Sequence, residues 1–216
     1  MKFHWTKTNF LIKKIFRNYV WDIPNAENKI YLTFDVGPTP EITEGVLEQL
    51  KIDQVKATFF CIGKNIANNP DLFSKIITEG HSIGNHTYNH LNGWNTSNEE
   101  YLENITLCQF QILNVKSNIC NLQSGIFRPP YGKIKKAQSK KLRRLGYKII
   151  MWDVLSADFD QNISPEKCLE NVLLNVKSGS VIVFHDSVKA FRNLEYSLPK
   201  SLEILKNRGF KFDVIQ

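Results

Sequence analysis

The sequence predicts an α/β fold, a distorted or incomplete (β/α) barrel of about seven parallel strands. Short apolar runs rich in β-branched and aromatic residues alternate with stretches of helical periodicity between residues 30 and 214, as parallel strands and their crossover helices do. No GxGxxG or Walker-type glycine motif follows a strand, which disfavours a nucleotide-binding doubly wound sheet. Reactive side chains stand near the ends of five strands, and a parallel barrel gathers strand ends on one face.

The expected strands begin with residues 30–34, an apolar run of β-branched and aromatic side chains that ends before Asp35. Glycine, proline or a polar residue follows most of the later runs. These later strands are expected over residues 56–61, 81–84, 125–128, 147–152, 180–184 and 210–214.

Helices are expected between the strands, and capping residues mark several of their ends. Ser97 and Glu100 form a capping box, while Thr39-Pro40 and Ser164-Pro165 have the chemistry of a helix start. Glycine commonly stops a helix, which predicts helix ends at Gly80, Gly146, Gly179 and Gly209. The helices are therefore expected near 40–51, from 71 to 80, from 97 past 113, up to 146, from 164 to 179 and over 198–206.

At 216 residues the chain is long enough for one domain with a full core and too short for two ordinary ones. We expect a basic lead-in over residues 1–28 and the main domain over residues 29–216. Within the lead-in, residues 10–17 predict a short basic amphipathic helix. Packing against the main domain is its preferred role, and contact with an anionic membrane surface is the alternative.

No CxxC pair is present, which predicts free and mostly buried thiols. The cysteines are Cys61, Cys108, Cys120 and Cys168. No apolar run reaches the roughly 18 residues that a membrane-spanning helix needs. The N-terminus gives no convincing signal peptide, because Lys13 and Lys14 interrupt its apolar stretch.

The net charge of +7 is unevenly distributed, since residues 104–152 contain no Asp or Glu and carry ten Lys or Arg. A basic face of this kind could meet an anionic polymer or a membrane surface. The preferred interpretation is a solvated helix face, because Lys is abundant along the whole chain. No nucleic-acid partner is predicted.

Asp35 stands at the end of the first expected strand, just before the turn at Gly37-Pro38. Alone, this carboxylate could simply cap the turn. His86 and His90 have a spacing that lets two imidazoles hold one metal, although a lone HxxxH pair is weak support. Further strand ends carry polar and aromatic residues, and the whole set predicts an active site. These residues are Arg128, Tyr131, Asp158, Phe159 and His185.

Five motifs occur in an order that resembles the polysaccharide deacetylases of carbohydrate esterase family four. They are Thr33-Phe-Asp-Val-Gly-Pro38, His86-Thr-Tyr-Asn-His90, Arg128-Pro-Pro-Tyr-Gly132, Trp152 through Asp158-Phe159, and Val183-Phe-His185. The family's fourth motif usually ends in Asp-Trp and its fifth usually reads Leu-x-His, so both differ slightly here. The resemblance covers residues 29 to 215 and implies a distorted (β/α) barrel. It also implies a hydrolase that removes acetyl groups from N-acetylated oligo- or polysaccharides.

The resemblance implies a divalent metal, with zinc preferred, held by His86 and His90. Asp35 would take the proton of the attacking water as general base, and Arg128 would keep that carboxylate ionised and aligned. The backbone N–H of Tyr131 would stabilise the developing oxyanion.

On the leaving-group side, His185 would protonate the amine and Asp158 would orient its imidazole. The rings of Tyr131, Phe159 and Trp94 could present their faces to a sugar, and the alternative for each ring is packing in the core. Asp186 is expected to cap a turn rather than to act in catalysis.

Val36 departs from the first motif, which normally reads Thr-Phe-Asp-Asp-Gly-Pro, because valine offers no ligand atom where the family has a metal-binding aspartate. Three outcomes are open. The metal binds weakly through the two histidines, Asp35 turns to the metal at the expense of its role as base, or the protein binds sugar without hydrolysing it. The predicted function is therefore a metal-dependent glycan N-deacetylase that Val36 could impair, and the alternative is a carbohydrate-binding pseudoenzyme.

A third and weaker interpretation is a scaffold that uses the basic face and the lead-in helix at a membrane. The sequence leaves open the glycan, the metal, the oligomeric state and the compartment. Glycan substrates favour the cell envelope, whereas free cysteines and the lack of a recognisable signal peptide favour the cytoplasm.

Overall fold

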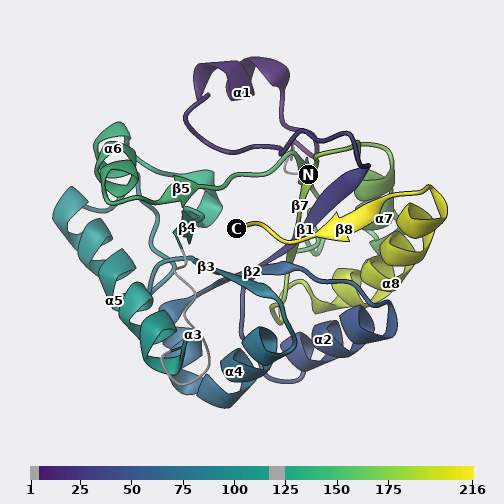
Figure 1. Cartoon of the computed structure of the whole chain (residues 1–216), viewed down its shortest axis with the longest axis horizontal. Coiled ribbons are helices and arrows are strands. Elements are labelled where there is room, and N and C mark those ends of the chain that lie inside the picture. The colour runs from purple at the N-terminus through teal and green to yellow at the C-terminus, as the bar shows by residue number, and fades with distance from the viewer. Residues whose placement is uncertain (1–4, 117–124) are drawn as a thin grey trace.

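The computed structural model describes residues 5–116 and 125–216. One eight-stranded sheet runs through it, with seven strands in the order β5-β4-β3-β2-β1-β7-β6 and β8 beside β1, all of them paired in parallel. Figure 1 shows the strands curled around the centre of the molecule, with helices α2 to α8 outside them. The predicted distorted (β/α) barrel is confirmed.

The strands are short except for β1, which crosses the middle of the sheet. They are β1 Lys29–Val36, β2 Thr58–Cys61, β3 Ser82–Asn85, β4 Ile126–Phe127, β5 Lys148–Ile149, β6 Val154–Leu155, β7 Val181–His185 and β8 Lys211–Asp213. The sequence analysis missed β6, because a two-residue strand leaves almost no periodic pattern.

The helices connect successive strands on the outside of the sheet. They are α1 Phe10–Ile15, α2 Ile42–Ile52, α3 Gly63–Asn68, α4 Pro70–Thr78, α5 Asn98–Lys116, α6 Lys136–Arg144, α7 Pro165–Leu173 and α8 Phe191–Asn207. The predicted caps of α5 and α7 are confirmed: Ser97 Oγ accepts from the N–H of Glu100, and Ser164 Oγ accepts from the N–H of Lys167, both at 3.2 Å.

Some predicted helix boundaries were wrong. Thr39-Pro40 does not cap α2, which follows Glu41 at φ 64°, and the N–H of Thr39 instead donates to Thr43 Oγ1. Helix α3 was not foreseen, and α7 ends at Leu173, well before Gly179. Helix α8 starts at Phe191 rather than at the predicted residue 198, so Pro199 lies in its interior instead of at its first turn. There the burial of one leucine-rich face outweighs the hydrogen bond that Pro199 cannot donate.

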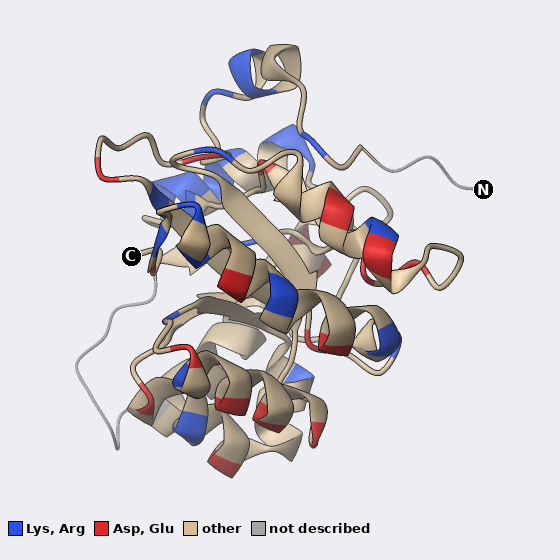
Figure 2. Ribbon diagram, turned by 90° about the vertical axis from the view of Figure 1, so that its right-hand side faces the viewer, with Lys and Arg blue, Asp and Glu red and all other residues tan. Residues whose placement is uncertain are grey.

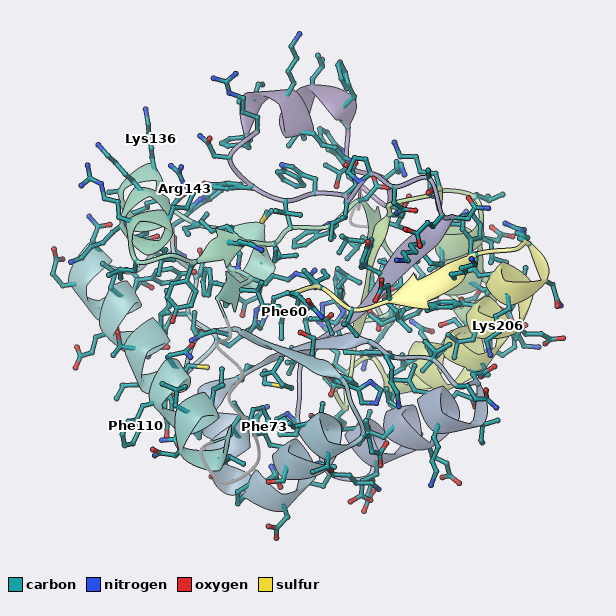
Figure 3. The ribbon with its side chains drawn as sticks, in the orientation of Figure 1. Phe60, Phe73, Phe110, Lys136, Arg143 and Lys206 are labelled. Carbon is teal, nitrogen blue, oxygen red and sulfur yellow. The ribbon has the colours of Figure 1, made fainter. Side chains whose placement is uncertain are left out.

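The described residues form three apolar clusters, and two of them lie on opposite sides of the central strands. The larger fills the space between the sheet and the helices, where Phe73 of α4 is completely buried. The smaller lies inside the curl of the sheet and contains Phe60 of β2 and Ile215 at the C-terminus. Figure 3 labels Phe60 inside the ring of strands and Phe73 on its outer side. Both faces of the strands are therefore buried, as parallel sheets require.

The thiols of the described residues agree with the prediction. Cys108 and Cys168 are free and buried, Cys61 is buried, and Cys120 lies outside the described residues. Burial raises the pKa of Cys108 and of Cys168 to about 12, so both are protonated and unreactive at neutral pH.

The lead-in joins the sheet at the opening between β5 and β6. Val20 forms a parallel bridge with Ile150, and Lys7 forms an antiparallel bridge with Val154. The N–H of Val20 donates to the carbonyl of Ile149 at 2.8 Å, and the carbonyl of Val20 accepts from Met151 at 2.7 Å. The barrel is thus closed by chain that precedes its first strand.

Candidate active site

Asp35 and His185 lie side by side on the central strands β1 and β7. They are register partners in the parallel ladder, so their Cα atoms are at the same height. Asp35 is buried and His185 is partly exposed. Because parallel strands end at the same edge of a sheet, this register brings a carboxylate and an imidazole to one face of the barrel.

Arg128 is completely buried and contacts Asp35 directly. One guanidinium nitrogen donates to Asp35 Oδ1 at 2.6 Å and to Thr33 Oγ1 at 2.7 Å. The other two donate to backbone carbonyls that follow β5. The guanidinium also stacks on Phe60, with Cζ 4.0 Å from the ring centroid. The predicted Arg128–Asp35 salt bridge is present, and each guanidinium nitrogen has a partner.

Asp158 is completely buried and holds His185 with both of its oxygens. Oδ2 accepts from the backbone N–H of His185 at 2.6 Å, and Oδ1 lies 2.7 Å from Nδ1. Burial lowers the pKa of His185, but attraction to the Asp158 carboxylate outweighs burial, so the pKa is raised overall. Since Nδ1 is engaged, Nε2 is the nitrogen left for proton transfer. The predicted contact between the two residues is confirmed.

His86 and His90 come together on the loop after β3, with ring centroids 5.0 Å apart. His86 Nδ1 donates to the carbonyl of Arg128 at 2.8 Å, which leaves a lone pair on Nε2. His90 Nδ1 lies 3.0 Å from the hydroxyl of Tyr131. Burial lowers the pKa of both imidazoles to about 3, so both are neutral at neutral pH. Neutral imidazoles fixed by a second hydrogen bond are suitable metal ligands.

The donor set contains two imidazoles and lacks a third protein ligand. No group of three or more His, Cys, Asp or Glu side chains among residues 5–116 and 125–216 could hold a metal ion. Asp35 is engaged by Arg128, and the neighbouring Val36 has no donor atom. The chemistry of this set therefore fits a divalent metal only through His86 and His90.

Backbone strain is concentrated at the strand ends that carry these side chains. Eight non-glycine residues have positive φ in the part of the chain that the structure describes, and five of them are at this face. The five are Val36, Thr87, His90, Tyr131 and Ala157. A φ of 91° is unusual for a β-branched residue such as Val36, whereas Asp and Asn tolerate positive φ better. Strained backbone of this kind is typical of functional sites.

The three aromatic residues predicted to contact a sugar differ in position. Tyr131 is 60% exposed, and its ring lies edge-on to His90 with centroids 4.6 Å apart. Phe159 lies edge-on to His185 with centroids 5.0 Å apart. Trp94 is 58% exposed, but its indole N–H donates to the carbonyl of Ile134 at 3.3 Å, on the loop before α6. Tyr131 and Phe159 therefore flank the histidines, and Trp94 makes its contacts elsewhere.

Sequence reasoning missed Asn104, which lies on α5 and fixes the histidine loop. Its Oδ1 accepts from the N–H of Tyr88 at 2.8 Å and from that of Asn89 at 2.9 Å. The N–H of Tyr88 also donates to the backbone carbonyl of Asn104 at 3.1 Å, so this one buried residue of α5 makes three hydrogen bonds with the loop. An asparagine on the inner face of an expected helix was the available signal, because a buried amide needs a partner.

Asp186 acts on the turn after Asp35, as expected. It is completely buried, and it accepts from the N–H of Gly37 at 2.9 Å and from Thr43 Oγ1 at 2.6 Å. A Cβ atom at Gly37 would lie 1.9 Å from Asp186 Oδ2, so only glycine fits there. Burial raises the pKa of Asp186 to about 7. The carboxyl therefore fixes the path of the chain immediately after the candidate base.

A sequence model of the polysaccharide deacetylase family matches residues 22–150, which is more than half of the chain. The chain belongs to the polysaccharide deacetylase family. A peptidoglycan-N-acetylglucosamine deacetylase of Bacillus cereus is 37% identical over 195 residues, which cover 89% of this chain and 88% of that protein. Chitin deacetylase 2 of Saccharomyces cerevisiae is 33% identical, over 80% of this chain and 55% of its own length.

Solved structures of other polysaccharide deacetylases share the fold. A peptidoglycan N-acetylglucosamine deacetylase in complex with 4-naphthalen-1-yl-N-oxidanyl-benzamide superposes with a TM-score of 0.87 at 32% identity, covering 96% of this chain and 95% of that one. A mutant of a family pseudoenzyme, with restored enzymatic activity, has a TM-score of 0.80 at 25% identity, covering 90% and 68%. The fold therefore occurs in both active and inactive relatives.

Proposed function

We propose that this polysaccharide deacetylase hydrolyses N-acetyl groups on amino-sugar glycans of the peptidoglycan or chitin kind. The observation that carries the proposal is that a carboxylate and an imidazole, each held by a charged partner, lie at the same face of the barrel. Asp35 is bound by Arg128 at 2.6 Å, and His185 is bound by Asp158 at 2.7 Å. A protein that only binds sugar does not need a carboxylate and an imidazole that are each held by an oppositely charged partner. Relatives that deacetylate peptidoglycan and chitin support this substrate class.

The metal in this proposal is a divalent cation, with zinc preferred because its ligands are imidazoles. His86 and His90 would hold it through the nitrogens that face away from their second hydrogen-bond partners. When bound, such an ion polarises a carbonyl oxygen and lowers the pKa of water. Val36 contributes no ligand, so we expect weak binding and reduced activity.

The chain's own residues then divide the proton transfers between them. Asp35 accepts a proton from the water that adds to the acetyl carbonyl carbon, and its salt bridge to Arg128 holds the carboxylate in place for that role. The backbone N–H of Tyr131 donates to the oxygen that becomes negative. His185 donates the proton of Nε2 to the amine as the carbon–nitrogen bond breaks, and acetate leaves. Tyr131, whose ring contacts His90, and Phe159, whose ring contacts His185, would present ring surface to the sugar.

The second candidate function is a carbohydrate-binding pseudoenzyme. Val36 favours it, because a site with two protein ligands holds a metal poorly. The existence of a pseudoenzyme with the same fold, in which mutation has restored activity, supports the idea that such a state is reached by small changes. Both candidates require the same sugar-facing surface, so only turnover separates them.

The test is acetate release by the zinc-loaded protein from N-acetylglucosamine oligosaccharides and from peptidoglycan fragments, with Asp35→Asn as the matched inactive control. Loss of a general base lowers the rate by about 10²–10⁴-fold, so the wild type should exceed the control by that margin. Calorimetric binding of the same oligosaccharides is measured in parallel. If the wild type binds the oligosaccharides but releases no more acetate than Asp35→Asn, the pseudoenzyme is the correct function and the deacetylase is ruled out.

A further inference from the structure

The lead-in exposes a cluster of large apolar side chains. On α1, Phe10 is 69% exposed, Leu11 is 61% exposed and Ile15 is 72% exposed, and Trp5 and Phe16 beside the helix are also exposed. Helix α1 buries none of its residues completely. A helix that served only to pack against the barrel would turn these side chains inward. Figure 1 shows α1 standing off the ring of strands, outside the layer formed by the other helices.

This exposure is built into the fold, because α1 is anchored by other groups. Lys13 forms ion pairs with Asp22 and with the completely buried Asp153. Ile12 packs against the apolar cluster that contains Leu142 of α6. The contacts that hold α1 therefore use its inner residues and leave Phe10, Leu11 and Ile15 facing solvent. Several large apolar side chains exposed together on one short, fixed element indicate an interaction site.

The same surface carries cations that have no acidic partner among the described residues. Residues 5–22 contain four Lys or Arg and one acidic residue, Asp22; Lys7 and Lys13 form ion pairs with carboxylates, whereas Lys14 and Arg17 are exposed. Figure 2 shows the blue of basic residues, and no red of acidic ones, on the ribbon of α1, whose basic residues are Lys13 and Lys14. Helix α6, which shares the cluster of Ile12, adds exposed cations and no acidic residue. Figure 3 shows two of them, Lys136 and Arg143, projecting outward from α6 on the side of the molecule where α1 stands.

We propose that α1 and the outer face of α6 dock the protein on the surface of an anionic lipid bilayer. The apolar side chains of α1 would enter the boundary between headgroups and acyl chains, with Trp5 at the interface, and the cations would contact lipid phosphates. A soluble anionic polymer would satisfy the cations but leave the apolar patch in water. A second copy related by a two-fold axis would place cations of α1 against the same cations. A bilayer accommodates both features.

The docking is on the surface of the membrane. No helix among the described residues is long and apolar enough to cross a bilayer. Helix α1 has six residues, so it is about 9 Å long and can only lie in the interface. This geometry would hold the barrel beside the membrane, with α1 as the point of contact.

The test is co-sedimentation of the full chain with vesicles of phosphatidylglycerol and phosphatidylcholine, compared with phosphatidylcholine alone. The combined variant Phe10→Ser, Leu11→Ser, Ile15→Ser should bind at least about tenfold more weakly, because it removes the inserting side chains. The matched control is the combined variant Ile52→Ser, Leu174→Ser, Val188→Ser. These apolar side chains are as exposed as those of α1 but lie outside it, so vesicle binding should be unchanged. Circular dichroism confirms that each variant is folded.

A charge-reversal pair tests the electrostatic part independently. Lys14→Glu with Arg17→Glu should weaken binding to the anionic vesicles at least about tenfold and reduce its salt dependence, whereas Lys51→Glu with Lys64→Glu, on exposed positions of α2 and α3, should not. Equal binding to neutral vesicles, or no effect of either α1 variant, would overturn the proposal. Two further results would also overturn it. In the first, soluble polyphosphate displaces the protein from the vesicles and the serine variant binds as the wild type does. In the second, the wild type does not bind vesicles but self-associates, and the serine variant does not self-associate.

Discussion

The carboxylate of Asp158 makes two contacts with the same residue, one to the backbone N–H of His185 and one to its imidazole. The contact with the backbone N–H fixes the position of the main chain at His185, and the contact with the imidazole fixes which ring nitrogen carries the proton. This arrangement favours the charged imidazolium, because the pKa of His185 is raised in spite of burial. A residue with this pKa direction is suited to give a proton to a leaving amine.

Asp158→Asn should therefore change the pH profile of deacetylation. Without the carboxylate, burial is no longer outweighed and the pKa of His185 falls. A general acid must be protonated, so the alkaline limb of kcat/KM should move to lower pH, and the maximum rate should drop by roughly 10²-fold. The measurement is acetate release against pH with zinc-loaded protein. The control is Asp213→Asn, because Asp213 lies on β8 beside Tyr31, near the start of β1. If the alkaline limb of kcat/KM stays at the same pH in Asp158→Asn, the assignment of His185 as general acid is refuted.

At this scale the sequence predicted the pairs Arg128–Asp35 and Asp158–His185, because motif order places each member at a strand end. It could not predict the φ of 91° at Val36 or the hydrogen bond from Arg128 to Thr33. Both depend on how distant segments meet, since Thr33 and Arg128 are far apart in the chain. Local residue patterns carry no information of that kind.

At the scale of elements, the loop that carries His86 and His90 depends on a helix that follows it in the chain. Asn104 of α5 accepts from two backbone N–H groups of this loop, and Asn85 accepts from the N–H of Thr87. The loop has little regular secondary structure, so these side-chain amides supply the hydrogen bonds that a strand or helix would otherwise make.

Asn104→Leu should loosen the histidine loop, because the N–H groups of Tyr88 and Asn89 lose their side-chain acceptor and only Tyr88 keeps a bond to the backbone carbonyl of residue 104. We expect a loss of about 1 kcal/mol in the free energy of unfolding and a lower affinity for zinc. Asn104→Asp keeps an acceptor oxygen at the same place and should retain more of both properties. Urea unfolding and zinc calorimetry on the two variants provide the comparison. Equal zinc affinity in the wild type and Asn104→Leu would show that α5 does not position the ligands.

The elements that the sequence predicted well are long or sharply capped, such as β1, α5 and the start of α7. Those it missed are β6 and α3, which are too short to show a period, and the first half of α8. Pro199 normally indicates a helix start, but here the apolar face that includes Leu194 and Leu198 continues on both sides of it. Tertiary burial decided these cases, and a single sequence does not display tertiary burial.

At the scale of the whole molecule, the lead-in completes the barrel through a buried ion cluster. Asp153 is completely buried, accepts from Ser180 Oγ at 2.6 Å and is paired with both Lys7 and Lys13. Burial opposes ionisation of Asp153, but these three partners outweigh it and its pKa is lowered. The cluster therefore ties chain from before β1 to the segment that precedes β6.

Replacing both lysines by methionine should destabilise the fold by about 3–5 kcal/mol, because a buried carboxylate loses its cations. Adding Asp153→Asn to that variant removes the unpaired charge and should recover most of the loss. Lys206→Met is the control: its partner Asp53 is near the surface, and a change below about 1 kcal/mol is expected. Urea unfolding measures all three. A double variant as stable as the wild type would mean that the lead-in does not contribute to barrel closure.

The central claim is that the proton-transfer groups are complete and that only a third metal ligand is missing, at Val36. The decisive measurement is zinc affinity with acetate release for the wild type, Val36→Asp and Val36→Gly. The aspartate supplies a ligand and tolerates positive φ, whereas the glycine only relieves the backbone. Val36→Asp should bind zinc at least about tenfold more tightly and release acetate faster, and Val36→Gly should match the wild type. Equal zinc affinity and equal rates in the wild type and Val36→Asp would contradict the claim.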